Sequence, residues 1–375
     1  MATIERYTAS DGSTRYRVRY RGPARRQTDK RGFRSKRAAE QFAATVEVEK
    51  LTGSYVSPSA GRVSTGEWVR RWLADRSDLR PTTAERYAGI VRTHITPRWD
   101  SVLLSSLRHA DVQHWVGELT SAGLSPASVR KCHRVLSLAL DLAVKERLIV
   151  TNPATGVKIA RSNVAPRRYL SHRQVQALAE AAGPTGRPVV YVLAYCGLRW
   201  GEMAALKVRD VDLGRRRITV EAAVTEVQGH LVWGSPKTNQ RRTVPIPAFV
   251  APIVAAAIDG KAPDDIAFTA PGGGVLRYRA ARLSWFDAAV KASGCPEGFH
   301  PHELRHAAAS LAISAGANVK AVQRMLGHAS AAMTLDTYAD LFADDLDDVA
   351  MRLDHAASLE SVGKMWAKDQ DHGQS

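Results

Sequence analysis

Six residues in the C-terminal half of the chain could together cleave and reseal a phosphodiester: Arg199, Lys237, His302, Arg305, His328 and Tyr338. A guanidinium group is permanently charged and offers parallel N–H groups that match a pair of phosphate oxygens. A phenol can attack phosphorus, an imidazole can take its proton, and an ammonium group can protonate the departing oxygen. We expect such a set to work through a covalent tyrosine ester, without a metal ion.

The middle of the set lies in one short segment, from His302 to His306, which continues as an apolar, alanine-rich run to Ala315. This pattern predicts a helix. On a helix, His302, Arg305 and His306 are three and four positions apart and share one face, so that a phosphate could meet all three side chains. Arg199 lies elsewhere, between a glycine and a helical stretch, and we expect it at or near a helix start.

The remaining side chains suggest how the reaction would run. Tyr338 is the candidate nucleophile, and a phenol with an ordinary pKa near ~10 needs a base, for which His302 is the candidate. Lys237 is expected at the exposed tip of a hairpin formed by the two strands that flank it, where it could protonate the departing 5′-oxygen. His328 could hydrogen-bond a non-bridging oxygen.

Two further residues have open roles. Glu202 lies one helical turn after Arg199 and could orient an active-site side chain. His306 could contribute to the site or could satisfy a hydrogen bond in the core.

The order and spacing of these residues resemble the tyrosine recombinase, or phage integrase, family. The resemblance rests on Cys196-Gly197-Leu198-Arg199-Trp200-Gly201-Glu202, Pro236-Lys237-Thr238 with Arg242-Thr243-Val244-Pro245-Ile246, His302-Glu303-Leu304-Arg305-His306, Leu326-Gly327-His328 and Tyr338. It implies a 3′-phosphotyrosyl intermediate, a free 5′-hydroxyl and strand exchange through a four-way Holliday junction. The implied chemistry uses neither a nucleotide nor a metal cofactor.

The same resemblance implies the partners. They are double-stranded DNA at attachment core and arm sites, further copies of the chain in a homotetramer on DNA, a host bending factor and an excision directionality factor. We therefore interpret the chain as an integrase that joins phage or mobile-element DNA to a host attachment site. Two alternatives stay open: a recombinase that resolves chromosome dimers or moves a conjugative element, and a DNA-binding regulator that does not cut.

The segment from His302 to His306 also matches the helical zinc pattern of metalloproteases. That pattern needs a third protein ligand, but the next acidic residue downstream is Asp336 and the next histidine, His328, already has a role. Arg305 on the ligand face would repel a dication. We therefore disfavour zinc hydrolysis.

The chain of 375 residues is strongly basic, with a formal net charge of +16, which favours a polyanionic partner such as DNA. Forty arginines against thirteen lysines suggest a GC-rich genome, and hence an actinobacterial phage or integrated element. No apolar run reaches the ~18 residues of a membrane span. The three cysteines, Cys132, Cys196 and Cys295, have no paired spacing. We expect a protein of the reducing host cytoplasm, acting on DNA.

Residues 1–60 are predicted to form an arm-type DNA-binding domain. Period-two alternation from Tyr16 to Tyr20, and a second run ending at Phe33, indicate two or three strands. An amphipathic helix over residues 36–52 would cover one face of this sheet. Residues 1–37 hold twelve basic and three acidic side chains. Because strand side chains alternate, one strand face carries Arg15, Arg17, Arg19 and Arg21.

Residues 62–150, after a linker, are predicted to form a helical, SAM-like core-binding domain. Apolar spacing indicates four helices, near residues 65–75, 82–95, 108–122 and 125–146. Pro81 and Pro126 suit first-turn positions, and Thr82 or Ser125 lies near a cap. The candidate phosphate contacts are Arg86, Arg92, Arg130, Lys131 and Arg134.

A linker over residues 151–168 leads to the expected catalytic domain at residues 166–355, which is mostly helical with a few strands. The whole chain is thus predicted to be mainly α with small β-sheets (α+β). From Asp340 onward nine acidic and three basic residues follow, with apolar residues on one helical face. The resemblance implies that this region docks on a neighbouring protomer, while packing on its own domain stays open. Residues 356–375 are the predicted C-terminal tail, and its extreme end, residues 369–375, is expected to be disordered.

Overall fold

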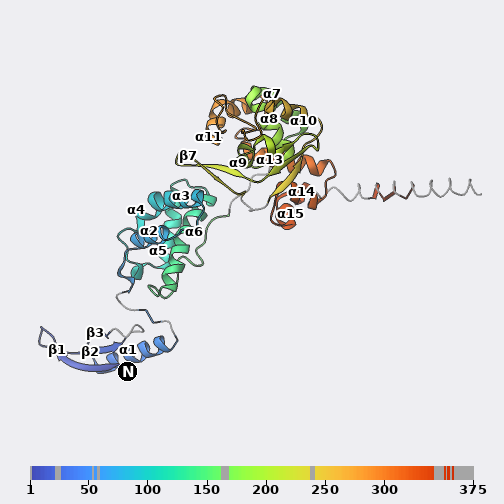
Figure 1. The fold of residues 1–375 in the computed structure, drawn as a ribbon. Coiled ribbons are helices and arrows are strands. Elements are labelled where there is room, and N and C mark those ends of the chain that lie inside the picture. Colours follow the sequence, from blue (N-terminus) through green and yellow to red (C-terminus); the bar gives the residue numbers. More distant parts are fainter. Residues whose placement is uncertain are drawn as a thin grey trace, which may run out of the picture. The chain divides into compact units, whose positions relative to one another are not determined.

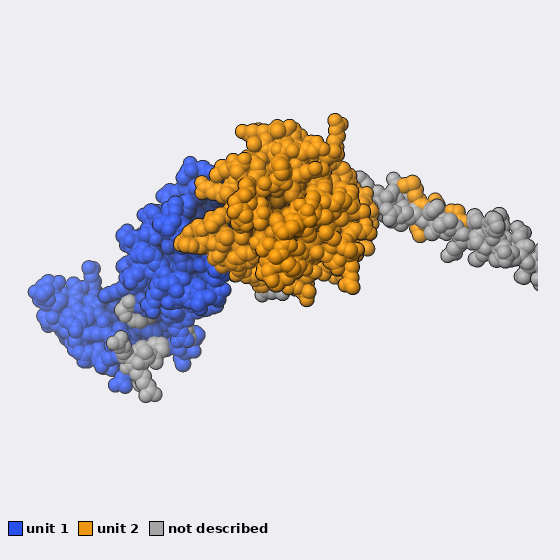
Figure 2. Space-filling view, turned by 45° about the horizontal axis from the view of Figure 1, so that its top comes forward, with its two compact units in different colours: residues 1–165 blue, residues 166–375 orange. Residues whose placement is uncertain are grey.

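The computed structural model describes residues 2–21, 27–52, 55–56, 60–161, 169–236 and 241–341, with short stretches at 350–351, 353–354 and 357–358. The chain divides into two compact units, residues 1–165 and 166–375 (Figure 2). Helices predominate and the sheets are small and antiparallel (Figure 1), which confirms the predicted mainly α, α+β class. Within the described ranges, no helix combines the length and the apolar character that a membrane span requires.

The first unit begins with a three-stranded antiparallel sheet and one helix. In order across the sheet, the strands are β1 (Thr3–Thr8), β2 (Thr14–Arg21) and β3 (Gln27–Phe33). Helix α1 (Lys36–Leu51) begins after its cap Ser35 and covers one face, where Val18 and Tyr20 of β2 pack against Ala39 and Val46. The predicted strands and helix are confirmed.

The other face of β2 carries the four predicted arginines, but acidic side chains lie among them. Glu5 of β1 accepts hydrogen bonds from Arg17 (2.8 Å) and Arg19 (3.0 Å). Asp11 pairs with Arg15 at 3.5 Å. This face is therefore a network of ion pairs in which part of the positive charge is already balanced.

The four helices predicted for residues 62–150 are all present, as α2 (Thr65–Ala74), α3 (Pro81–Ile90), α5 (His109–Ser121) and α6 (Pro126–Lys145). The α3 run continues through η2 (Val91–Ile95) into α4 (Thr96–Trp99). Ser125 caps α6 by accepting from the Ser128 amide, whereas α3 begins after Arg80 and not at Thr82. Buried tryptophans fill the core, and Trp68 Nε1 donates to the Ala139 carbonyl at 2.7 Å.

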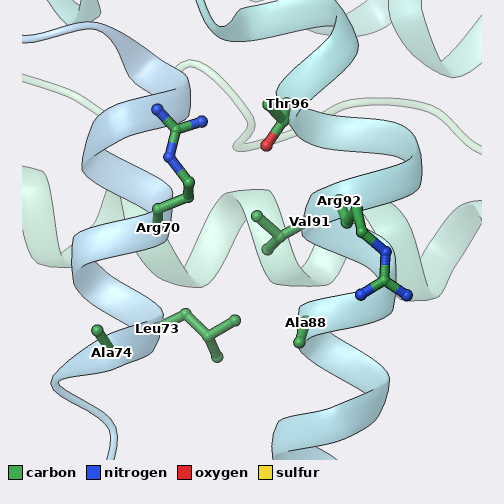
Figure 3. A pocket seen from close by; sticks show the side chains of 7 residues that line it. All are labelled: Arg70, Leu73, Ala74, Ala88, Val91, Arg92 and Thr96. Carbon is green, nitrogen blue, oxygen red and sulfur yellow. The ribbon is translucent and has the colours of Figure 1, made fainter.

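An open apolar pocket of about 430 Å³ lies between α2 and the α3–η2 run. Leu73 and Val91 extend toward each other across it, and Arg70 and Arg92 lie at its margin (Figure 3). Asp100 binds Arg70 at 2.6 Å. Arg92, a predicted phosphate contact, thus lies beside an apolar hollow.

The first part of the predicted interdomain linker packs on the helices instead of leaving them. The side-chain amide of Gln113 on α5 bonds both backbone groups of Lys158, at 2.9 and 3.0 Å. Asn152 donates to Asp141 of α6 at 2.6 Å, and Ala154 is fully buried. The packed structure therefore extends beyond residue 150, the predicted end of the helical domain. Residues 162–168 lie outside the described residues.

The second unit is built on helices that enclose one large core. They are α7 (His172–Ala181), α8 (Gly183–Tyr191), which continues as η4 (Val192–Cys196), α9 (Trp200–Ala204), α10 (Ala251–Ile258), α11 (Tyr278–Ala281), which continues through η6 (Arg282–Phe286) into α12 (Asp287–Ala292), α13 (Pro301–Ser314), α14 (Val319–Leu326) and α15 (Ala331–Tyr338). The alanine-rich α13 packs directly on η4, because its small side chains allow the two backbones to approach closely.

The strands of this unit correct one prediction. Strands β4 (Val211–Asp212), β5 (Arg217–Val220) and β8 (Arg242–Pro245) form one sheet, and β6 (Ala223–Val227) pairs with β7 (His230–Gly234) in another. Lys237 was expected at the tip of a hairpin made by the strands before and after it. Those strands, β7 and β8, belong to different sheets, so they form no hairpin with each other. Lys237 itself lies outside the described residues.

Two glycines with a left-handed backbone conformation end helices shortly before candidate site residues. Gly197 (φ 65°) ends η4 two residues before Arg199, and Gly327 (φ 63°) ends α14 directly before His328. A Cβ atom at Gly327 would lie 2.9 Å from Cδ of Arg242. Glycine is required there for both its backbone conformation and its lack of a side chain.

Substitution of Gly327 by alanine should therefore destabilise the fold more than the same change at a glycine that is strained but uncrowded. Gly294 is the matched control, with φ 67° and open space around its position. We expect Gly294→Ala to cost about 1–2 kcal/mol from backbone strain, and Gly327→Ala to cost about 1–3 kcal/mol more from overpacking. Urea unfolding of both variants measures this difference, and equal losses would contradict the close approach of Arg242.

Candidate active site

Arg305 lies deep in the second unit, on the inner face of α13, and is 4% exposed. Its guanidinium group donates to the carbonyl oxygens of Gly197 and Leu326, the residues that close η4 and α14. Burial lowers the pKa of Arg305 to about 9, with a further contribution from Arg199, so the group remains charged at neutral pH. Arg305 thus joins three segments that are far apart in sequence.

Glu202, on α9, is the buried counter-charge of this region. Its carboxylate accepts from Arg199 Nη1 at 2.7 Å and from the Arg199 backbone amide at 2.9 Å. It also accepts from Arg242 Nη1 at 3.0 Å. Burial alone would raise the Glu202 pKa, but the hydrogen bonds and charges of Arg242 and Arg199 outweigh it and lower the pKa to about 2. The role of Glu202, which the sequence left open, is therefore observed: its carboxylate holds Arg199.

Arg242 was not among the predicted site residues. Its side chain is 8% exposed, pairs with Glu202, and donates through Nε to the Met325 carbonyl at 3.2 Å. It therefore ties β8 to the end of α14. The sequence offers one signal for Arg242, because this basic residue lies in a strand two positions before the buried Val244. It does not show which side chains Arg242 contacts.

His328 follows Gly327 and hydrogen-bonds through Nδ1 to Thr334 Oγ1 at 3.0 Å. Burial, together with the charges of Arg305, Arg199 and Arg242, lowers the pKa of His328 to about 4. The ring is therefore neutral at pH 7. When Nδ1 accepts from the threonine hydroxyl, Nε2 carries the proton and can donate to an oxygen of a bound anion.

Tyr338, the last residue of α15, is 2% exposed and packs against Ala309, Ile313 and Leu326. Its hydroxyl lies 2.8 Å from Nδ1 of His306. The predicted base was His302, whereas the imidazole that this structure records at the phenol belongs to His306.

Four of the six predicted residues lie near one another in the described part of the chain. Arg199, Arg305 and His328 lie around the ends of η4 and α14, and Tyr338 lies close enough for its charge to affect the pKa of Arg305. His302 is one turn before His306 on α13, and their rings meet edge to face with centroids 5.3 Å apart. Lys237 lies outside the described residues.

The charges of the cluster favour an anionic ligand. Three guanidinium groups face one carboxylate, and His328 is neutral, so the balance is positive. The nearby thiol of Cys196 is no competing nucleophile, because burial raises its pKa to about 12. In the part of the chain that the structure describes, no group of three histidine, cysteine or acidic side chains could hold a metal ion.

The mainly helical fold, with two arginines and a neutral histidine near a tyrosine, agrees with the tyrosine recombinases that the sequence motifs resemble. Residues 168–344 match the phage integrase family, and residues 66–120 match the N-terminal SAM-like domain of phage integrases. The chain belongs to this family. It is a site-specific tyrosine recombinase, an enzyme that cleaves and rejoins DNA, as the sequence predicted.

The similarity extends over most of the chain. An integrase of Mycobacterium phage L5 is 27% identical, over 74% of this chain and 75% of its own length. The tyrosine recombinase XerC of Ralstonia pickettii is 30% identical, over 62% of this chain and 74% of its own. Among solved structures, a lambda integrase tetramer bound to a Holliday junction has a TM-score of 0.60 at 20% identity, covering 87% of this chain and 95% of that one. This last likeness concerns the fold.

Replacing Glu202 by glutamine should destabilise the second unit strongly, because Arg199 and Arg242 would share no counter-charge. We expect a loss of about 3–5 kcal/mol in the free energy of unfolding. The control is Glu226→Gln, which breaks a more exposed pair with Arg277 and should cost below about 1 kcal/mol. Urea denaturation of the two variants gives the comparison.

The Glu202→Gln substitution should also change how the stability of the protein depends on pH. Because the Glu202 pKa is lowered in the folded state, its contribution is complete above the ordinary value of 4.5 and is lost as the pH falls toward about 2. Over this range, wild-type protein should lose more stability than Glu202→Gln. Parallel curves for the two proteins would show that Glu202 is not the buried anion.

Proposed function

We propose that this enzyme is an integrase that joins the DNA of a phage or another mobile element to a host attachment site. The observation that carries the proposal is the convergence of Arg199, Arg305 and His328 on one positively charged place beside Tyr338. The similarity to the integrase of Mycobacterium phage L5 supports the biological task. This similarity also agrees with the proposed actinobacterial origin.

In the proposed mechanism, Arg199 and Arg305 bind the scissile phosphate and neutralise the charge that develops on it. A single arginine in this role is worth on the order of 10³ to 10⁵ in rate in other phosphoryl-transfer enzymes. His328, neutral and donating through Nε2, binds a non-bridging oxygen. His302 also belongs to the six candidate residues, and its side chain is exposed on α13.

Tyr338 is the proposed nucleophile. Its oxygen bonds to phosphorus while the bond to the 5′-oxygen breaks, which leaves a 3′-phosphotyrosyl ester and a free 5′-hydroxyl. Lys237 is the proposed acid that protonates the departing oxygen. Because the ester keeps the energy of the phosphodiester bond, rejoining needs neither a nucleotide nor a metal cofactor.

We assign the parts of the chain to different DNA segments. Residues 1–60 are proposed to bind arm sites, through a strand face whose arginines are partly balanced by Glu5 and Asp11. Residues 62–150 are proposed to bind the attachment core, and the match of residues 66–120 to the SAM-like domain supports this. Residues 166–355 are the proposed catalytic domain.

Four protomers are proposed to assemble on DNA and to pass through a Holliday junction. The solved lambda integrase tetramer on a Holliday junction supports this assembly. A host bending factor and an excision directionality factor are the further partners that we propose. The acidic region from Asp340, which would join neighbouring protomers, lies largely outside the described residues.

The resolution of chromosome dimers is a second candidate task, favoured by the similarity to XerC. The N-terminal sheet argues for integration, because an arm-binding module serves no purpose in a reaction between two core sites alone. Deletion of residues 1–60 separates the tasks. Loss of recombination on substrates with arm sites supports integration, and unchanged recombination supports dimer resolution.

Replacement of Tyr338 by phenylalanine should abolish covalent capture of DNA. A nicked suicide duplex carrying the attachment core, taken from DNA that flanks the gene, is incubated with protein in EDTA and run on a denaturing gel. Wild-type protein should form a covalent band, and Tyr338→Phe should form none while still shifting the duplex on a native gel. A covalent band in the variant would refute Tyr338 as the nucleophile.

Replacement of Lys237 by alanine should slow cleavage by about 10²- to 10⁴-fold, because the departing oxygen would lack an acid. A substrate with sulfur in place of the bridging 5′-oxygen needs no acid and should restore the rate of Lys237→Ala. Arg305→Ala is the control, because the sulfur substitution leaves its loss uncorrected. Equal rescue of both variants would contradict the assignment of Lys237.

A further inference from the structure

Helix α13 places two functional side chains on consecutive residues. Arg305 points into the cluster of arginines, and the next residue, His306, reaches the hydroxyl of Tyr338 through Nδ1 at 2.8 Å. Successive residues on a helix differ by about 100° in direction, so one helix can serve both the phosphate and the nucleophile. The position of His306 beside the reacting oxygen is therefore fixed by the same element that fixes Arg305.

Exposure increases stepwise away from the phenol. Tyr338 is 2% exposed, His306 is half-buried and His302 is exposed. The rings of His306 and Tyr338 lie 5.8 Å apart, and those of His302 and His306 lie 5.3 Å apart, centroid to centroid. A proton that leaves the buried hydroxyl thus meets His306 first, and His302 lies on the way to solvent.

We propose that His306 is the residue that accepts the proton of Tyr338 when the phenol attacks, and that His302 lies behind it as the next carrier toward solvent. This inference rests on the proposed function in one respect, namely that Tyr338 is the nucleophile. It replaces His302 as the immediate base.

The step is balanced in protons and electrons. The O–H bond of Tyr338 breaks, an N–H bond forms at Nδ1 of His306, and the phenolic oxygen bonds to phosphorus as the bond to the 5′-oxygen breaks. His306, with Nε2 already protonated, becomes an imidazolium ion and releases its Nε2 proton toward His302 or water. In rejoining, Nε2 of His306 takes up a proton from His302 or water, and the tyrosine oxygen leaves phosphorus and recovers the proton at Nδ1.

The test can separate proton transfer from simple positioning. Asparagine places a polar atom where Nδ1 of histidine lies, so His306→Asn can keep a hydrogen bond to Tyr338 but cannot take its proton at neutral pH. His302→Asn is the matched comparison on the same helix. Single-turnover formation of the covalent band on the nicked duplex is measured for wild type, both variants and Tyr338→Phe. Circular dichroism and native gel shifts report folding and DNA binding.

We expect His306→Asn to cleave on the order of 10² to 10⁴ times more slowly than wild type, with a smaller loss in His302→Asn. A base must be neutral, so protonation of His306 at acid pH should slow the wild-type reaction, by about tenfold per pH unit once the imidazolium form predominates. This acid limb should persist in His302→Asn and disappear in His306→Asn. The rings of Tyr338 from α15 and of His302 from the same helix lie next to His306. The charged residue Arg305 directly precedes it on α13.

His328 is not the source of such a limb, because its pKa is lowered to about 4. A near-wild-type rate in His306→Asn, or loss of the acid limb in His302→Asn alone, would overturn the proposal. Failure of the proposed function looks different, since Tyr338→Phe would then still form the covalent band. If His306→Asn does not fold, His306→Gln takes its place in the same comparison.

A second measurement excludes a purely structural effect. Site-specific incorporation of 3-fluorotyrosine at position 338 gives a more acidic phenol, which depends less on a base. The replacement should raise the cleavage rate of His306→Asn by a larger factor than that of wild type. An equal effect in both proteins would mean that His306 positions Tyr338 without taking its proton.

Discussion

The charge balance around Glu202 is the constraint on which the site depends. One buried carboxylate is shared by Arg199 and Arg242, and the charge of Glu202 also acts on Arg305. In a medium of low dielectric constant, an uncompensated charge is very costly, so these side chains hold α9, β8 and the end of α14 together. The residues that would bind phosphate are therefore also residues that hold the fold together.

Local signals predicted much of this architecture, because helix starts are encoded by a few adjacent residues. Ser125 is a predicted cap, and Pro126 lies in the first turn of its helix as predicted. Strand pairing is not local in this sense. The sequence predicted strands on both sides of Lys237, but it does not say which strands pair, and β7 and β8 proved to be in different sheets.

The same limit applies to the site. Ordered motifs brought out Arg199, Arg305 and Tyr338, because their spacing along the chain is itself informative. Arg242 and His306 acquire their roles only when distant segments meet, at Glu202 and at Tyr338. Both residues lie within motifs, but a single sequence does not show which distant side chain each of them contacts.

The burial of Arg305 has a consequence for the nucleic acid. A guanidinium group that is 4% exposed and already bonded to two carbonyl oxygens cannot extend toward a distant phosphate. The rotational freedom of this side chain is lost on folding, before any ligand arrives. If Arg305 binds the scissile phosphate as proposed, the duplex must bend or shift to bring its backbone to this side chain, at an energy that depends on the stiffness of its base steps. In that mechanism, the rigidity of one arginine makes binding depend on how easily each DNA sequence deforms.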